Sequence, residues 1–73
     1  MTAEANLVAE LQAMGVKVLR FVPGIALSFQ VDDSTYDKAL RAVRAYGFAP
    51  IRMTQNIFEA DLLHFQPRYE IAQ

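Results

Sequence analysis

The alternation of side chains between residues 25 and 32 constrains the fold more than any other feature of the sequence. Large apolar residues take every second position, with small or polar residues between them: Ile25, Leu27, Phe29 and Val31 against Ala26, Ser28, Gln30 and Asp32. Successive side chains of a strand point to opposite faces, so this pattern predicts a strand with one buried face. A chain built around such a strand needs a second layer to cover that face.

A second alternating run precedes this strand and predicts a hairpin with it. Val16, Val18 and Val22 fall on one face, and Pro23-Gly24 separates the two runs. Proline suits the first central position of a type II turn, and glycine suits the second, where φ is positive. A two-residue loop pairs Val22 with Ile25, Val18 with Phe29 and Val16 with Val31. It also sets Arg20 opposite Leu27, where a bulge could turn the arginine outward.

Two segments with helical spacing flank the hairpin. Thr2 to Met14 carries an apolar stripe and ends at Gly15, and Ser34 to Tyr46 carries another and ends at Gly47. The stripes are Leu7, Val8, Leu11 and Met14 in the first segment, and Tyr36, Ala39, Leu40 and Val43 in the second. Asp33 or Ser34 is expected to cap the second helix.

The remaining residues predict one further strand and an ambiguous last segment. Phe48 to Thr54 has Ala49, Ile51 and Met53 on one face, and Pro50 favours an edge position. From Ile57 to Ile71 two interpretations stay open. One is a strand around Leu62, Leu63 and Phe65, and the other is a short helix from Asn56 to Leu63.

The predicted order is αββαβ(β) in a single domain, residues 1–73. We expect an α+β two-layer sandwich with two helices on one face of an antiparallel sheet. Moving the first strand of a ferredoxin-like plait to the C-terminus gives this order. The segment from Asp32 to Met53, a capped helix that closes in Tyr-Gly-Phe before a strand, resembles the second helix and last strand of small plait domains such as ACT-type regulatory domains.

Composition narrows the function. The 73 residues include no cysteine and one histidine, which excludes disulfides and thiolate metal sites and predicts neither a metal nor a cofactor. Seven Lys and Arg against eight Asp and Glu give a net charge of −1, without the positive excess typical of nucleic-acid binding. No apolar run is long enough to cross a membrane, and nothing resembles a signal peptide, so we expect a cytoplasmic protein.

No group of residues predicts catalysis. Asp32, Asp33 and Asp37 surround a helix start, where acidic residues are expected for capping and for the helix dipole. His64 has no nucleophile or orienting partner at a suggestive spacing, and a surface or interfacial histidine is the simpler interpretation. Val22-Pro23-Gly24-Ile25 lacks the residues of a phosphate-binding loop. We therefore expect no enzyme.

Two surfaces remain as candidates for binding. One sheet face should stay uncovered, and its expected protein-contact residues are Leu19, Phe21, Ala26 and Ser28, with Lys17 and Gln30 beside them. The second helix carries a basic stripe for an anionic partner: Lys38, Arg41 and Arg44. The leading hypothesis is a protein-interaction module that acts through this sheet face or through an edge strand, and the expected partner is a second copy. Its role would be that of a regulator or of a small phage- or plasmid-encoded inhibitor. The alternatives are nucleic-acid binding through the stripe, and a ligand-sensing domain or small enzyme with a site between subunits.

Overall fold

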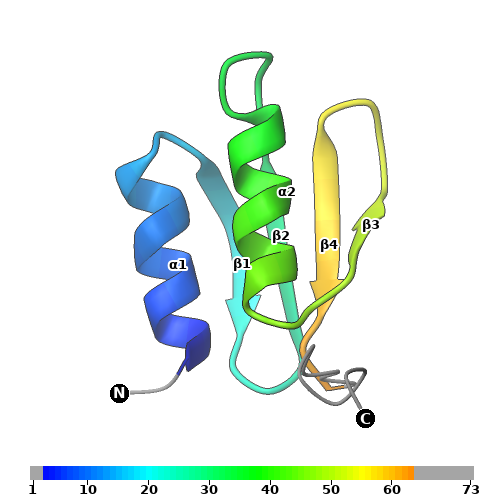
Figure 1. The fold of residues 1–73 in the computed structure, drawn as a ribbon. Coiled ribbons are helices and arrows are strands. Elements are labelled where there is room, and N and C mark those ends of the chain that lie inside the picture. The colour runs from blue at the N-terminus through cyan, green and yellow to red at the C-terminus, as the bar shows by residue number, and fades with distance from the viewer. Residues whose placement is uncertain (1–2, 64–73) are drawn as a thin grey trace, which may run out of the picture.

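A computed structural model describes residues 3–63 of the chain (Figure 1). In chain order the elements are α1 (Ala3–Ala13), β1 (Lys17–Val22), β2 (Ala26–Gln30), α2 (Tyr36–Ala45), β3 (Pro50–Arg52) and β4 (Ile57–Asp61). Thr2, the expected start of the first helix, His64 and the expected strand residues beyond Leu63 lie outside the described part. The helix considered for Asn56 to Leu63 is wrong, because β4 occupies that segment.

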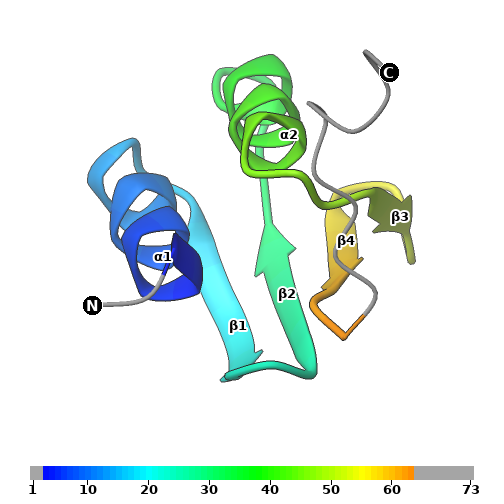
Figure 2. The same ribbon diagram turned by 60° about the horizontal axis from the view of Figure 1, so that its bottom comes forward.

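The four strands form one antiparallel sheet in the order β1-β2-β4-β3. Both helices lie on the same side of it, as Figure 2 shows, which confirms the expected α+β arrangement of two helices on one sheet face. Proline at the start of β3 agrees with its position at the edge of the sheet. Among residues 3–63 no helix is long and apolar enough to span a membrane.

The core lies between the helices and this sheet face. Leu7 and Leu11 of α1 are fully buried, and α2 contributes a buried stripe, as the helical spacing predicts. The sheet contributes Leu27 and Phe29 from β2 and Phe58 and Ala60 from β4. The rings of Phe29 and Phe58 stack, with centroids 6.1 Å apart and an angle of 17° between their planes.

A bulge in β1 changes the predicted register of the hairpin. Val18 pairs with Phe29 as expected, but the ladder then shifts, so that Arg20 pairs with Ser28 and Phe21 with Leu27. Leu19 is the extra residue. The shift turns Arg20 away from the core, and it carries Phe21 to the helix side, where Phe21 packs against the buried cluster. The expectation that Phe21 lies on the uncovered face is therefore wrong.

The same shift moves the end of the hairpin. Val22 pairs with Ala26 rather than with Ile25, and Ile25 is exposed instead of buried. The predicted type II turn is present nonetheless, since Gly24 has φ 77° and the Ile25 amide donates to the Val22 carbonyl oxygen at 2.9 Å. The loop is one residue longer than a two-residue hairpin loop because β1 contains one residue more than its ladder uses.

Asp32, and not Asp33 or Ser34, organises the start of α2. Its Oδ1 atom accepts the backbone N–H groups of Ser34 and Thr35 at 3.0 Å each, and the Ser34 hydroxyl at 2.7 Å. The Thr35 hydroxyl accepts the Asp32 N–H in return. The side-chain hydrogen bonds from Ser34, and then those from Thr35, lower the pKa of Asp32 below its ordinary value of 3.8.

This arrangement predicts an acid-dependent loss of stability at one residue. The charged form of Asp32 favours the folded state, so its contribution is complete above pH 3.8 and is lost as the pH falls through the lower folded pKa. The variant Asp32→Asn keeps an acceptor oxygen but cannot titrate. In urea unfolding at pH 7, 4 and 3, the wild type should be the more stable protein at pH 7, and the difference should shrink at pH 3. A difference that stays constant with pH would contradict this role.

Candidate functional site

The face of the sheet that the helices leave uncovered is defined by the strand pairing. Directly paired residues share a face, and Leu27, Phe29, Phe58 and Ala60 point into the core, so the residues between them point the other way. We call the outward set the open face: Lys17, Leu19, Arg20, Val22, Ala26, Ser28, Gln30, Ile51, Ile57, Glu59 and Asp61. No described residue outside the sheet is assigned to this face, and both helices lie on the other side (Figure 2).

The open face has exposed apolar residues near its two edges. Leu19 in the bulge is 43% exposed, and Ile51 on β3 is 55% exposed. Between them, Ala26, Ser28 and Ile57 are half-buried. Of the expected contact residues, the structure thus puts Leu19, Ala26 and Ser28 on one surface and Phe21 elsewhere. Lys17 and Gln30 also lie on the open face, as expected, paired with each other.

Charge on the open face is divided between strands. Lys17 and Arg20 lie on β1, whereas Glu59 and Asp61 lie on β4. The strand pairing aligns Arg20, Ser28, Glu59 and Ile51 in one row across the sheet. Arg20 and Glu59 are two strands apart, which corresponds to about 10 Å at the usual strand spacing. Sequence analysis missed this row, because it depends on the bulge and on β4 lying beside β2.

Both edges of the sheet carry features that oppose the addition of another strand. On β1 the bulge at Leu19 interrupts the ladder, and Lys17 and Arg20 flank it. On the opposite edge, β3 is three residues long and begins with Pro50, which has no N–H to donate. Bulges, charged residues, proline and short length are the usual protection of edge strands. The open face is therefore better suited to contact than the edges.

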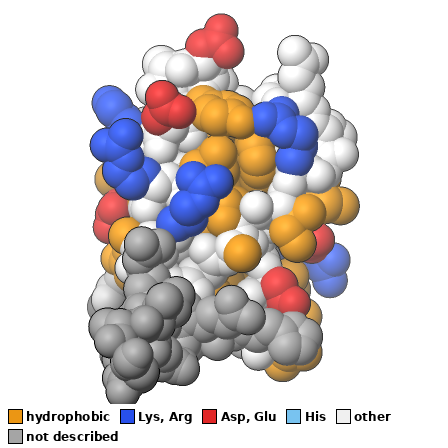
Figure 3. Space-filling model, turned by 45° about the vertical axis from the view of Figure 1, so that its right-hand side comes forward, with side chains coloured by type: hydrophobic (Ala, Val, Ile, Leu, Met, Phe, Trp, Pro, Cys, Tyr) orange, Lys and Arg blue, Asp and Glu red, His pale blue; other side chains and the backbone are white. Residues whose placement is uncertain are grey.

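A second surface runs along α2 and β3. Tyr36, Leu40, Arg41 and Arg44 line a groove of about 480 Å³ together with Asp37 and Ala45. Figure 3 shows apolar side chains exposed on this side of the molecule, with Lys or Arg side chains to both sides of them. The groove is open and its one acidic side chain, Asp37, offsets part of the arginine charge.

Arg52 fixes the β3 side of this surface. Its guanidinium donates to the Tyr36 hydroxyl and, at 2.7 Å, to the Gln55 carbonyl oxygen. The same group lies 4.9 Å from the centre of the Phe58 ring and 5.6 Å from that of Tyr36, which are favourable cation–π distances. Because it donates two hydrogen bonds within the chain and lies over two aromatic rings, Arg52 stabilises the contact between β3 and α2.

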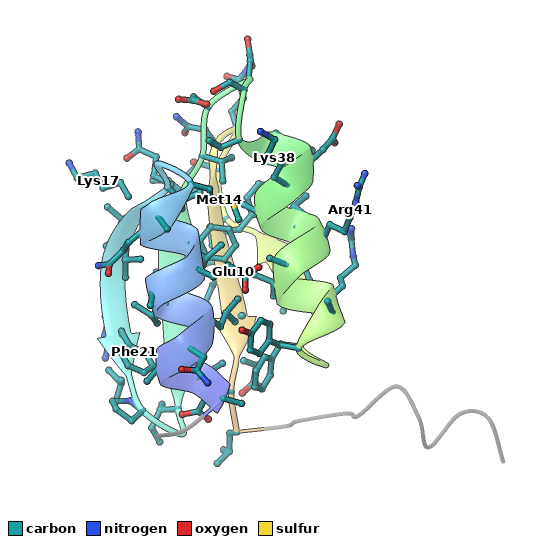
Figure 4. The ribbon with its side chains drawn as sticks, turned by 60° about the vertical axis from the view of Figure 1, so that its left-hand side comes forward. Glu10, Met14, Lys17, Phe21, Lys38 and Arg41 are labelled. Carbon is teal, nitrogen blue, oxygen red and sulfur yellow. The ribbon has the colours of Figure 1, made fainter. Side chains whose placement is uncertain are left out.

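The predicted basic stripe divides between two sides of α2. Lys38 and Arg41 border a shallow groove of about 370 Å³ against α1, whereas Arg44 lines the larger groove together with Tyr36 and Leu40, and Arg41 borders both. Figure 4 shows Glu10 directed into the space between the helices and Lys17 directed away from them. Glu10 Oε1 accepts the Tyr46 hydroxyl at 3.2 Å, and burial followed by this bond raises the pKa of Tyr46.

The described residues do not bring together a group that could hold a metal ion. Within residues 3–63 no three His, Cys, Asp or Glu side chains lie close enough together to hold a metal ion. Thr35, the buried polar residue of this part of the chain, is engaged with Asp32. Comparison with known proteins finds no matching family model, no matching curated protein and no matching solved structure.

Proposed function

We propose that this protein is a non-catalytic protein-interaction module that acts through the open face. The observation that carries the proposal is the combination of a sheet face that neither helix of residues 3–63 covers and exposed apolar residues on it, Leu19 and Ile51. A sheet normally buries one face against a second layer, and contiguous exposed apolar area is typical of interaction sites. A small cytoplasmic regulator, or an inhibitor that acts by covering its target, is the role this surface suits.

The strand order supports the proposal that the fold is a circularly permuted ferredoxin-like plait. In the ferredoxin-like plait, the first and last strands are antiparallel neighbours, so a chain in which the first strand is moved to the C-terminus keeps the same sheet. The order β1-β2-β4-β3, with a hairpin joining β3 to β4, is the one that this permutation produces. One helical layer then leaves one sheet face for a partner.

The basic stripe is the weaker candidate surface. Lys38, Arg41 and Arg44 are exposed, but Asp37 and Glu10 border the same grooves. Nucleic-acid binding draws most of its affinity from an excess of positive charge, and the chain carries a net charge of −1. An anionic partner at α2 is thus a competing hypothesis that the next experiment also tests.

Two charge-matched double variants test the open face. Leu19→Glu with Ile51→Glu adds two carboxylates to it, and Ala9→Glu with Gln12→Glu adds two to the exposed side of α1. Each tagged protein is used to capture partners, including a differently tagged copy of the chain. The open-face variant should bind about 100-fold more weakly, as expected when two apolar contacts are lost and two charges are desolvated. The α1 variant should bind normally.

Circular dichroism shows whether both variants are folded, as their exposed positions predict. Equal retention of the partner by the open-face variant and the wild type would contradict the proposal. So would loss of binding in an Arg41→Glu, Arg44→Glu variant with no loss in the open-face variant, because that result assigns the contact to α2.

A further inference from the structure

We propose that the partner of the open face is a second copy of this chain, packed face to face about a two-fold axis that runs parallel to β2. This inference rests on the proposed function and specifies the partner and its orientation. Charge is distributed over the paired strands in a way that favours this partner. A two-fold interface brings the same surface of both copies together, so the surface has to be complementary to itself.

Arg20 and Glu59 meet this condition for one placement of the axis. Arg20, Ser28 and Glu59 lie in one row on β1, β2 and β4, with the small Ser28 in the middle. Rotation about an axis along β2 sets β1 of one copy over β4 of the other and leaves each row at the same level. Arg20 of each copy then faces Glu59 of the other, and the two Ser28 residues face each other on the axis.

Other placements bring unfavourable groups together. An axis in the same plane but perpendicular to the strands sets β1 over β1 and β4 over β4, so that like charges on those strands face each other. An axis between β2 and β4 sets Ser28 against Glu59 and Arg20 against Ile51, which desolvates both charged groups without an ionic partner. The axis along β2 pairs opposite charges twice in the central row, and it sets Lys17 over Ile57 and Asp61 over Val22 at the two ends of the overlapping strands.

The apolar residues of the open face fit the same arrangement. Ile51 lies next to Glu59 in the row, on the outer strand β3. When β1 of the second copy lies over β4, its bulge residue Leu19 comes beside Ile51 at the rim of the contact. Ala26 and Ser28 in the centre are small enough for the two sheets to approach. Three strands of about five residues overlap over roughly 14 by 17 Å, which is small for a protein interface, so we expect a weak and reversible dimer.

Charge reversal tests the pairing. Sedimentation equilibrium would compare the wild type, Arg20→Glu, Glu59→Arg and the variant carrying both changes. Each single reversal sets like charges together across the interface and should weaken association at least 10-fold. The double reversal restores opposite charges and should return the dissociation constant to within about threefold of the wild type. Unfolding in urea verifies that all four proteins are folded.

The matched control uses the same changes of net charge on the helical side. Arg41→Glu and Glu10→Arg alter the chain charge as the first two variants do, and both side chains lie at the groove between α1 and α2. They should leave the dimer unchanged. A dimer that responds to net charge wherever it is placed would contradict the specific pairing.

Cross-linking tests the position of the axis. Because the chain has no cysteine, Ser28→Cys introduces a single thiol at the predicted axis. A short bismaleimide reaches across the roughly 10 Å between packed sheets and should join two copies at Cys-substituted Ser28. Gln12→Cys, on the exposed side of α1, should give little cross-linked dimer under the same conditions.

The outcomes separate this inference from the proposed function. A dimer that Leu19→Glu with Ile51→Glu dissociates, but that the double charge reversal does not restore, overturns the predicted orientation and supports the open face. A chain that stays monomeric up to millimolar concentration overturns the second copy as partner. In that case, capture of another protein by the wild type, and its loss in the open-face variant, decides the proposed function separately.

Discussion

Replacement of Phe21 with aspartate is expected to remove most of the domain's stability, whereas the same replacement at Leu19 leaves the stability almost unchanged. Leu19 and Phe21 are two positions apart in β1, and both are large and apolar. The bulge puts Phe21 opposite Leu27 and against the core, while Leu19 is 43% exposed. A carboxylate at Phe21 loses the packing of an aromatic ring and places a charge beside apolar groups. The expected cost is at least about 3 kcal/mol.

The measurement is urea unfolding followed by circular dichroism, with Leu19→Asp as the matched control. A domain of this size has a free energy of unfolding near the lower end of about 5–15 kcal/mol, so Phe21→Asp should lose more than half of it and should unfold at a much lower urea concentration than the wild type. Leu19→Asp should change the free energy by less than about 1 kcal/mol, as is usual for exposed positions. Equal stability of the two variants would show that the faces of β1 are assigned incorrectly.

The second large effect is expected at Phe29. Its side chain is fully buried, stacks on Phe58 and pairs across the hairpin with Val18. Phe29→Ala removes a ring from the centre of a small core, which typically costs about 3–5 kcal/mol. In a domain of 60–100 residues each 1 kcal/mol lowers the melting temperature by about 4–8 °C. The melting temperature should therefore fall by at least about 12 °C.

Phe29→Leu is the appropriate comparison, because it keeps an apolar side chain of similar reach in the same place. We expect it to cost clearly less than the alanine variant, since most of the buried volume is retained. Thermal unfolding followed at a helix-sensitive wavelength measures both variants. A decrease of less than 4 °C for Phe29→Ala would mean that Phe29 is not a central packing residue.

The parts of the fold that the sequence predicts well are those in which one face is unambiguous. In β2, Leu27 and Phe29 alternate with Ala26 and Ser28, so the inner and outer faces cannot be exchanged without burying polar groups. The helical stripes are equally clear, because the large apolar residues recur at helical spacing. The turn at Pro23-Gly24 follows from the backbone preferences of those two residues.

The orientation of β1 could not be predicted in the same way. Its sequence, Lys-Val-Leu-Arg-Phe-Val, has apolar residues on both faces, so alternation alone gives two acceptable patterns. The signal of a bulge was Arg20 opposite Leu27 on the core side, which a regular ladder would require. A one-residue irregularity depends on the competition between packing and pairing, and it reverses the face of every later residue.

The strand β4 carries a weak signal for a related reason. Its inward residues are Phe58 and Ala60, and alanine contributes little to an apolar alternation. Leu62 and Leu63 are larger apolar residues, so the strand was predicted around them and not at Ile57–Asp61, where β4 lies. The row of Arg20, Ser28 and Glu59 was consequently out of reach, since it requires both the bulge and the position of β4 beside β2.

The extra residue in β1 has a consequence for how this protein can change over generations. If Leu19 were deleted, the remaining residues of β1 would pair with the same partners in an uninterrupted ladder, because Lys17, Val18, Arg20, Phe21 and Val22 already match successive residues of β2. The interior would need no rearrangement. A single codon thus separates a sheet that presents a leucine at its margin from one that does not, and natural selection can add or remove that feature without disturbing the fold.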